Sequence, residues 1–334
     1  MSVPLSDLEA DVASVNEVDE PKKGAIAGRS PTQLAMARLR HDKVSMVAFA
    51  VIVISILMAI ASPILENMGI LDPYTPHYDL VGGLGTLPNG PFGGIGWHHM
   101  LGVEPGIGRD VLSRVFLGVT FSLMISTAAT IISVVFGMVF GIISGYAGGA
   151  TDFWISRWMD LILAFPQLLM LLALSPVLKD RITSMGVPAG TATSAVYLIV
   201  VLGFFGWPYL ARIVRGQVLT LRNREFVEAA RSLGATRRRI WFRELLPNLW
   251  APLLVYVSLT LPLFISAEAA LSFLGVGLQA PTPSLGNILN DSVSYFDPDP
   301  TFFFVPGIVL VLIVLAFNML GDGLRDALDP KSSR

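Results

Sequence analysis

The sequence predicts an all-α integral membrane protein with six transmembrane helices. Only 14% of its 334 residues are charged and 53% are hydrophobic, whereas ordinary soluble domains carry about 25% charged residues. Six nearly uncharged apolar runs approach the roughly 20 residues that a helix needs to cross the hydrocarbon core. Buried helices of a large soluble protein are the alternative, but runs this long with so little charge argue against them.

The apolar runs divide the chain into membrane spans and connecting segments. We expect the spans at residues 44–65, 119–143, 158–178, 195–214, 249–274 and 302–320. The segments outside them are an N-terminal tail at 1–43, an outer loop at 66–114, an inner segment at 215–248, an outer loop at 275–301 and a C-terminus at 324–334. Residues 115–323 form the core of the predicted protein.

Lysine and arginine are distributed unevenly between the two sides of this topology. With the N-terminus inside, the inner segments hold all but four of the 23 Lys and Arg residues. The four on the outer side are Arg109, Arg114, Lys179 and Arg181. Because positive charge favours the cytoplasmic side, we expect both termini in the cytoplasm.

The N-terminal tail differs in composition from the rest of the chain. Residues 1–29 are acidic and contain no aromatic residue, which indicates a mobile tail and not a signal peptide. Ser30 and Pro31 suit an N-cap followed by proline at the first helical position. The basic stretch 34–43 is then either a short helix at the inner membrane surface or an extension of the first span.

Glycine and proline mark three of the predicted spans. Gly137, Gly141 and Gly145 form a small-xxx-small pattern that lets helices approach closely, although glycine is also simply common in membrane helices. Pro166 and Pro208 each remove a backbone hydrogen bond, so we expect kinks in the third and fourth spans.

The inner segment between the fourth and fifth spans is the most informative part of the chain. Asn223 suits a helix N-cap and Gly234 suits a left-handed helix end, which predicts a helix over 224–233, with a second basic helical piece at 237–245. The apolar side chains on one face of the first helix are Phe226, Ala229, Ala230 and Leu233. Such a patch indicates a protein docking site, or equally a helix on anionic lipid.

A motif in this segment resembles the EAA loop of ABC importer permeases. Glu228-Ala229-Ala230 is followed at family spacing by Gly234 and Leu246-Pro247, although Glu244 stands where the family often has Ile. In that family the helix docks into a groove of the ATPase subunit. The coupling residues that the resemblance implies are Glu225, Phe226, Glu228, Ala229, Ala230, Leu233, Gly234, Leu246 and Pro247.

Three further stretches are similar to the DppC/OppC-type permeases of dipeptide, oligopeptide and nickel importers. They read GRDVLSR at 108–114, SFLGVGLQ at 272–279 and DGLRDALDP at 322–330. This chain has Val103-Glu104 where the family commonly has Thr-Asp. The resemblance implies a type I ABC importer permease fold, a multi-pass protein of the bacterial inner membrane, and peptide import. Nickel, other metal chelates or glutathione are alternative cargoes, and a secondary transporter is the alternative class.

The chain contains no Gly-x-x-x-x-Gly-Lys-Ser/Thr phosphate loop. We therefore expect a non-catalytic subunit that binds no cofactor, with ATP and Mg²⁺ on partner subunits. The resemblance implies a homologous second permease of the DppB/OppB type, two ATPase subunits or one fused ATPase, and an extracytoplasmic binding protein. Besides these and the lipid bilayer no partner is expected, nucleic acid included. His98-His99 with Glu104 does not suggest a metal site, because adjacent residues in a loop rarely both bind one metal.

Glu268 is the one clearly intramembrane acid in the sequence. A carboxylate there is costly unless it is paired, hydrated or protonated. It could line the transport path and meet a peptide's amino terminus, or it could hold the fifth span to a neighbouring helix, which we favour. Phe273 and Asn287 are the other candidate path residues.

Overall fold

The computed structural model describes residues 31–82 and 87–328, so the tail predicted at 1–29 and the cap predicted at Ser30 lie outside the described residues. Within those ranges the protein is mainly α-helical. Five helices are long and apolar enough to cross a membrane, and a bent pair of helices makes a sixth span when the pair is counted as one. The prediction of an all-α membrane protein is confirmed.

The five long helices coincide with five of the predicted spans. They are α3 (Lys43–Asn67), α4 (Val111–Ala147), α7 (Thr191–Leu221), α10 (Trp250–Phe273) and α12 (Pro300–Leu328). Three of them, α4, α7 and α12, continue well beyond the apolar runs. At α4 the start is set by Asp110, whose carboxylate accepts a hydrogen bond from the Ser113 amide at 2.7 Å. The helix α12 likewise runs into the segment predicted as the C-terminal tail.

The third predicted span is broken. In its place α5 (Gly149–Ala164) and α6 (Gln167–Ser184) meet at an angle of 88°. Phe165 between them is extended, with φ −83° and ψ 137°, the conformation that a following proline favours. The third predicted span is thus present as two helices and not as one kinked helix, and the break lies at the predicted Pro166. Pro208 lies inside α7, which continues through it.

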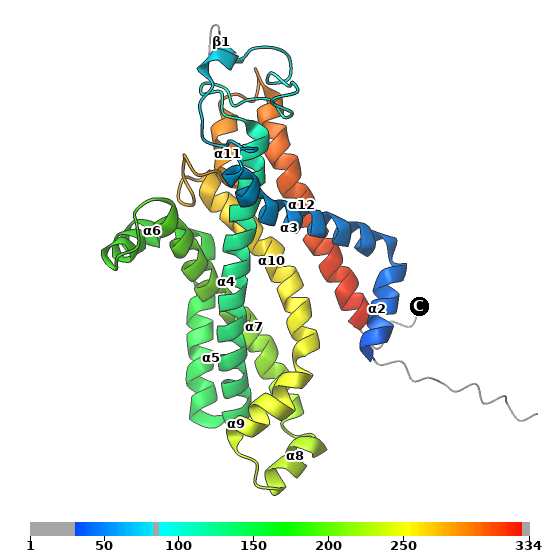
Figure 1. The fold of residues 1–334 in the computed structure, drawn as a ribbon. Helices are drawn as coiled ribbons and strands as arrows, with labels where there is room; N and C mark the ends of the chain where they lie inside the picture. Colours follow the sequence, from blue (N-terminus) through cyan, green and yellow to red (C-terminus); the bar gives the residue numbers. More distant parts are fainter. Residues whose placement is uncertain (1–30, 83–86, 329–334) are drawn as a thin grey trace, which may run out of the picture.

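The N-terminal helices α2 (Pro31–His41) and α3 pack beside α12, on one side of the molecule (Figure 1). Asp42 separates them, because its carboxylate accepts hydrogen bonds from the amides of Val44 and Ser45 at 3.1 and 3.3 Å and caps α3. The stretch predicted at 34–43 is thus a helix of its own and not an extension of the first span.

The connecting segments gather at the two ends of the bundle (Figure 1). At one end lie η1 (Tyr78–Leu80), the two-stranded hairpin of β1 (Val81–Gly82) and β2 (Leu87–Pro88), and α11 (Leu285–Val293). At the other end lie α8 (Glu225–Ser232) and α9 (Arg237–Arg239). The helix α11 falls where the sequence predicted only the loop 275–301, and a capping box of Ser284 and Asn287 starts it.

The most extensive helix contact among the described residues joins α4 to α7. A Cβ atom on Gly137, Gly141 or Gly145 would lie 2.7–2.8 Å from the Cβ atoms of Leu210, Val214 and Val218 respectively. The three glycines are buried, so their lack of a side chain sets the distance between the helices.

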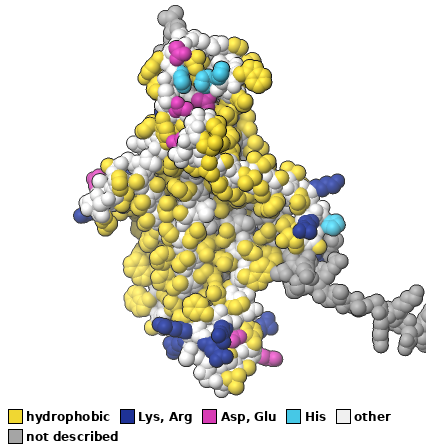
Figure 2. All heavy atoms as spheres, in the orientation of Figure 1, with side chains coloured by type: hydrophobic (Ala, Val, Ile, Leu, Met, Phe, Trp, Pro, Cys, Tyr) yellow, Lys and Arg dark blue, Asp and Glu magenta, His cyan; other side chains and the backbone are white. Residues whose placement is uncertain are grey.

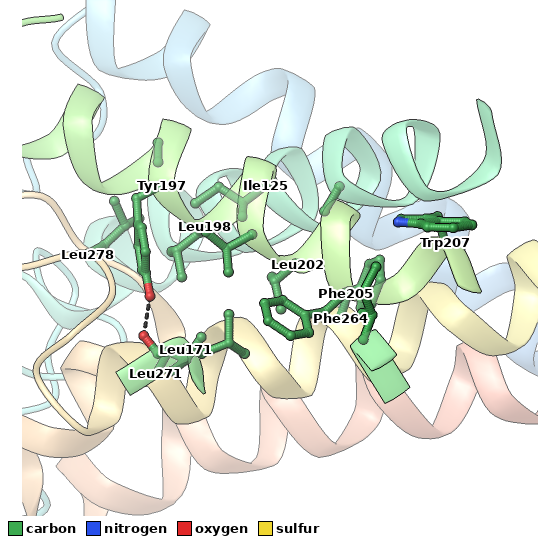
Figure 3. Close-up of a cluster of buried hydrophobic side chains, with 14 of the residues drawn as sticks. Ile125, Leu171, Tyr197, Leu198, Leu202, Phe205, Trp207, Phe264, Leu271 and Leu278 are labelled. Atoms are coloured by element: carbon green, nitrogen blue, oxygen red, sulfur yellow. Dashed lines mark hydrogen bonds between the residues drawn. The ribbon is translucent and has the colours of Figure 1, made fainter. Parts of the chain in front are cut away.

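A cluster of buried hydrophobic side chains fills the space between α6, α7 and α10 (Figure 3). Leu198, Leu202 and Phe205 of α7 face Phe264 and Leu271 of α10 in this cluster. The Tyr197 hydroxyl donates a hydrogen bond to the Leu171 carbonyl, which attaches the bent helix α6 to α7.

Candidate functional site

The helix α8 projects from one end of the bundle and is joined to it by short segments. It begins one residue after Arg224, whose side chain makes no capping hydrogen bond, so the N-cap predicted at Asn223 is wrong. It ends before Gly234, which has φ +77°, the left-handed conformation that was predicted. A Cβ atom on Gly234 would meet nothing within 4 Å, so backbone conformation alone favours glycine there.

One side chain of α8, Val227, is buried against the bundle. Val227 is 0% exposed and belongs to a cluster with Ile240 and Leu245 of the following π-helix η2 (Ile240–Leu245). The same cluster includes Val214 and Val218 from the end of α7. The sequence did not identify Val227, because the more apolar face of α8 is the opposite one.

That opposite face is not covered by any of the residues that the structure describes. Phe226 is 39% exposed and Leu233 is 88% exposed. Ala229 is also exposed and Ala230 is half-buried, while the acidic Glu225 and Glu228 lie in solvent. The chain then passes through η3 (Leu246–Asn248), in which Leu246 is half-buried and Pro247 exposed, into α10. The structure thus brings the predicted coupling residues to one end, with the apolar ones on an open surface.

Polar contacts join the ends of α4, α5 and α7 that lie nearest to α8. The Arg215 guanidinium of α7 donates two hydrogen bonds to Asp152 of α5, at 2.6 and 2.7 Å, and Ser144 of α4 donates to the same carboxylate at 2.5 Å. Arg222, directly after α7, donates to the Gly145 carbonyl at 2.9 Å. Three helices are therefore tied together just before the chain enters α8.

A groove of about 890 Å³ runs between α7 and α10 and reaches the end of α12. Its polar lining residues are Gln167, Tyr209, Gln217, Tyr256, Thr260 and Arg325. None of these residues stood out in the sequence as a candidate site. The available signal was the four-residue spacing of Tyr209, Ile213 and Gln217 along α7, which puts them on one helix face.

Two of the three predicted path residues are enclosed within the chain. Glu268 is 0% exposed and accepts hydrogen bonds from Ser122 of α4 at 2.5 Å and from Ser272 at 2.8 Å. The Asn287 amide group donates to the Thr282 carbonyl at 2.8 Å and its oxygen caps α11. Phe273, at the end of α10, is 37% exposed. None of the three lines the groove.

A buried charge cluster joins the outer loop to α4 and α11. Arg109 donates two hydrogen bonds to Glu104, at 2.7 and 2.8 Å. Arg114, which is 0% exposed, lies 3.5 Å from Glu104 and 3.7 Å from Asp291. Burial, followed by the nearby Glu104 carboxylate, raises the pKa of Asp291 above its usual value.

The histidines of the outer loop have other contacts. His99 Nδ1 lies 2.9 Å from an Asp110 carboxylate oxygen, and its ring lies 5.5 Å from that of His77. No group of three or more His, Cys, Asp or Glu side chains suited to a metal ion occurs among residues 31–82 and 87–328.

Comparison with known proteins places the chain in a family. The sequence model of the "Binding-protein-dependent transport system inner membrane component" family matches residues 137–334, and that of the "N-terminal TM domain of oligopeptide transport permease C" matches residues 30–81. The chain is 35% identical to the oligopeptide transport system permease protein OppC of Bacillus subtilis, over 99% of this chain and 98% of the relative.

Other relatives and a solved structure agree. The chain is 35% identical to the dipeptide transport system permease protein DppC of Alkalihalophilus pseudofirmus, over 93% of each chain. It is 37% identical to the glutathione transport system permease protein GsiD of Salmonella typhimurium, over 91% of each. An inward-facing structure of the MetNI methionine ABC transporter superposes with a TM-score of 0.52 at 21% identity, over 66% of this chain and 96% of that one, and shows the fold. The chain therefore belongs to the family of binding-protein-dependent transport inner membrane components, as a DppC/OppC-type ABC transporter permease.

Proposed function

We propose that this chain is the permease subunit of an ATP-driven importer of di- or oligopeptides, coupled to separate ATPase subunits through α8. The observation that carries this proposal is the uncovered apolar face of α8, which carries Phe226 and Leu233. Val227 packs on the other side of the helix, and none of the described residues is buried against this face. An ATPase groove that accepts it would bury the exposed side chains, which favours binding.

The groove between α7 and α10 is our candidate for this subunit's half of the transport path. Its glutamines and tyrosines offer amide and hydroxyl groups that donate and accept hydrogen bonds. Groups of this kind suit a peptide backbone, whatever side chains the peptide carries. A homologous permease of the DppB/OppB type would supply the other wall. In this assignment Glu268 and Asn287 are structural and do not contact the substrate.

The chemistry of ATP hydrolysis belongs to the partners in this proposal. Phosphoryl transfer requires backbone amides, a lysine and Mg²⁺ around the phosphates, and the sequence holds no such loop. ATP and Mg²⁺ would bind two ATPase subunits or one fused ATPase, and an extracytoplasmic binding protein would deliver the peptide. The complex would lie in the bacterial inner membrane, with both termini and α8 on the cytoplasmic side, as the distribution of Lys and Arg favours.

Glutathione import is the second candidate function. A relative with 37% identity is a glutathione transport permease, and glutathione offers the same amide groups to the groove as a short peptide does. Competition between labelled dipeptides, longer peptides and glutathione for uptake by the reconstituted complex would identify the substrate.

Reconstitution in lipid vesicles tests the main proposal. We expect the chain alone to hydrolyse no ATP and to accumulate no peptide. Adding the second permease, the ATPase subunits and the binding protein should produce both activities. Accumulation by the chain alone in a proton or sodium gradient would instead indicate a secondary transporter.

The coupling assignment has its own test. Glu228→Lys reverses a charge on the exposed surface of α8, so we expect normal membrane insertion and weaker binding of the ATPase subunits. Co-purification measures that binding. If Glu228→Lys transports at the wild-type rate, α8 is not the ATPase contact.

A further inference from the structure

A small basic pocket lies behind α8, on the side that faces the end of α4. It has a volume of about 370 Å³ and is lined by Tyr146, Ala147, Arg231, Ala235, Arg237 and Ile240. Arg231 comes from α8, Arg237 from α9 and Tyr146 from the last turn of α4. The pocket therefore joins the projecting segment to a membrane-spanning helix.

The charges of this pocket are not balanced within the described residues. Neither Arg231 nor Arg237 makes an ion pair in the part of the chain that the structure describes, and no acidic side chain lines the pocket. The Arg231 guanidinium lies over the Tyr146 ring, 5.8 Å from its centroid, which orients its N–H groups. Two guanidinium groups at one cavity suit a phosphate group, because their donors match its oxygens in pairs.

The pocket is directed away from the apolar face of α8. Arg231 follows Val227 by four residues, so at about 100° per residue it lies about 40° around the helix from that buried anchor. Phe226, Ala229 and Leu233 centre on the other side, about 170° from Arg231. A protein bound to the apolar face would therefore not reach into the pocket.

Aromatic side chains place the pocket at the edge of the membrane. The Trp241 ring lies edge-on to Tyr146, 6.2 Å between centroids, and Trp154 at the start of α5 and Phe242 are exposed. Such aromatic residues concentrate at the membrane–water interface. Figure 2 shows dark-blue Lys and Arg side chains gathered at this end, just beyond the broad hydrophobic surface of the helices. The pocket thus lies at the depth of lipid headgroups.

We propose that this pocket binds the phosphate group of an anionic phospholipid. Arg231 and Arg237 donate to the phosphate oxygens, and the acyl chains follow the exposed apolar surface of the adjacent helices. The bound headgroup bridges α8, α9 and the end of α4 and so helps to hold α8 at a fixed position. The site does not depend on which substrate the complex carries.

Lipid binding to the purified full chain tests this proposal. The delipidated protein is titrated in detergent with phosphatidylglycerol or phosphatidylcholine, and bound lipid is counted by native mass spectrometry. We expect phosphatidylglycerol to bind Arg231→Gln and Arg237→Gln about tenfold more weakly each, because each change removes charge-assisted hydrogen bonds. Arg238→Gln, which removes the same charge from the neighbouring position outside the pocket, should bind as the wild type does. Phosphatidylcholine binding should not change.

Three results would overturn the proposal. Equal binding of phosphatidylglycerol by the wild type and both pocket variants would exclude the site. Displacement of the lipid by millimolar inorganic phosphate would assign the pocket to free phosphate. Unchanged lipid binding with lost ATPase co-purification would assign it to an acidic side chain of the partner. Circular dichroism checks folding, and a loss of helix in Arg231→Gln or Arg237→Gln but not in Arg238→Gln would count against the proposal, because both replaced side chains are exposed.

Discussion

Single residues control how α8 is shaped and held. Gly234 ends the helix with φ +77°, although a Cβ atom added there would meet nothing within 4 Å. Val227 holds the helix to the bundle, and its neighbour Phe226 points outward. The end of α8 therefore depends on one backbone conformation, and its packing on the bundle involves one buried side chain.

Gly234→Val should disturb the end of α8. A β-branched residue resists positive φ, and the strain is on the order of 1–3 kcal/mol. We expect faster hydrogen exchange in α8 and weaker ATPase co-purification. Gly234→Asn is the matched control, because asparagine adopts the left-handed conformation more readily. If hydrogen exchange and ATPase co-purification are impaired equally in both variants, side-chain volume and not backbone conformation is what matters at this position.

Two acids of the buried charge cluster, Glu104 and Asp291, should contribute unequally to the free energy of unfolding. Glu104 contacts both Arg109 and Arg114 and is almost fully buried, so Glu104→Gln should lower the free energy of unfolding by about 3–5 kcal/mol. Asp291 is 36% exposed in its side chain and 3.7 Å from Arg114, so Asp291→Asn should cost less than about 1 kcal/mol. Thermal unfolding in detergent measures both. Equal losses would contradict the unequal roles that the geometry gives these two acids.

Glu268→Gln separates a structural role from a path role. Glutamine can accept from one serine and donate to the other, so we expect normal assembly and an unchanged peptide preference. Glu268→Leu removes the acceptor of the Ser122 and Ser272 hydroxyls, although Ser272 Oγ still accepts from the Leu278 amide, and should cost about 1–3 kcal/mol for each buried O–H donor left without an acceptor. A changed peptide preference in Glu268→Gln would show instead that the carboxylate meets the substrate.

At the scale of the helices, glycine determines the contact between α4 and α7. A Cβ atom at Gly141 would lie 2.7 Å from the Cβ of Val214, closer than packed atoms allow. We expect Gly141→Leu to separate the helices and to lower stability by about 1–3 kcal/mol, measured by thermal unfolding in detergent.

Gly216→Ala provides the control in the same pair of helices. Gly216 is exposed on α7, and a Cβ atom added there would meet nothing within 4 Å. Alanine there should leave stability unchanged or raise it by about 0.5–1 kcal/mol, because it favours the helix. If Gly141→Leu proves as harmless as Gly216→Ala, the α4–α7 contact is not as close as the structure has it.

The elements differ in how far the sequence determines them. The membrane-crossing part of α4 follows from its apolar run, but its start after Asp110 was not predicted. The break at Pro166 could be located but its 88° angle could not, because α6 is attached through contacts between residues distant in sequence, such as the hydrogen bond from the Tyr197 hydroxyl to the Leu171 carbonyl. The helix α11 was missed because its nine residues are too few for an apolar run, although its capping box was present in the sequence.

At the scale of the whole molecule, the family and the helical membrane-protein fold could be predicted and the groove could not. Motifs near α8 and in the outer loop are contiguous in sequence, so they could be recognised directly. The groove combines α7, α10 and the end of α12, which lie far apart in sequence. Glu268 drew attention as an intramembrane acid, but only the packing of α10 on α4 shows that serines enclose it.

The attachment of α8 to the end of α7 has a mechanical consequence. The 31 residues of α7 form a rod about 46 Å long, which Asp152 and the glycines of α4 stiffen near the α8 end. A tilt of about 5° about one end would displace the other by about 4 Å, nearly the roughly 5.4 Å rise of one helical turn. A rotation imposed at the α8 end would thus act as on a lever arm, and Gly206, the groove residue of α7 furthest from α8 and about 22 Å along the rod, would move by about 2 Å.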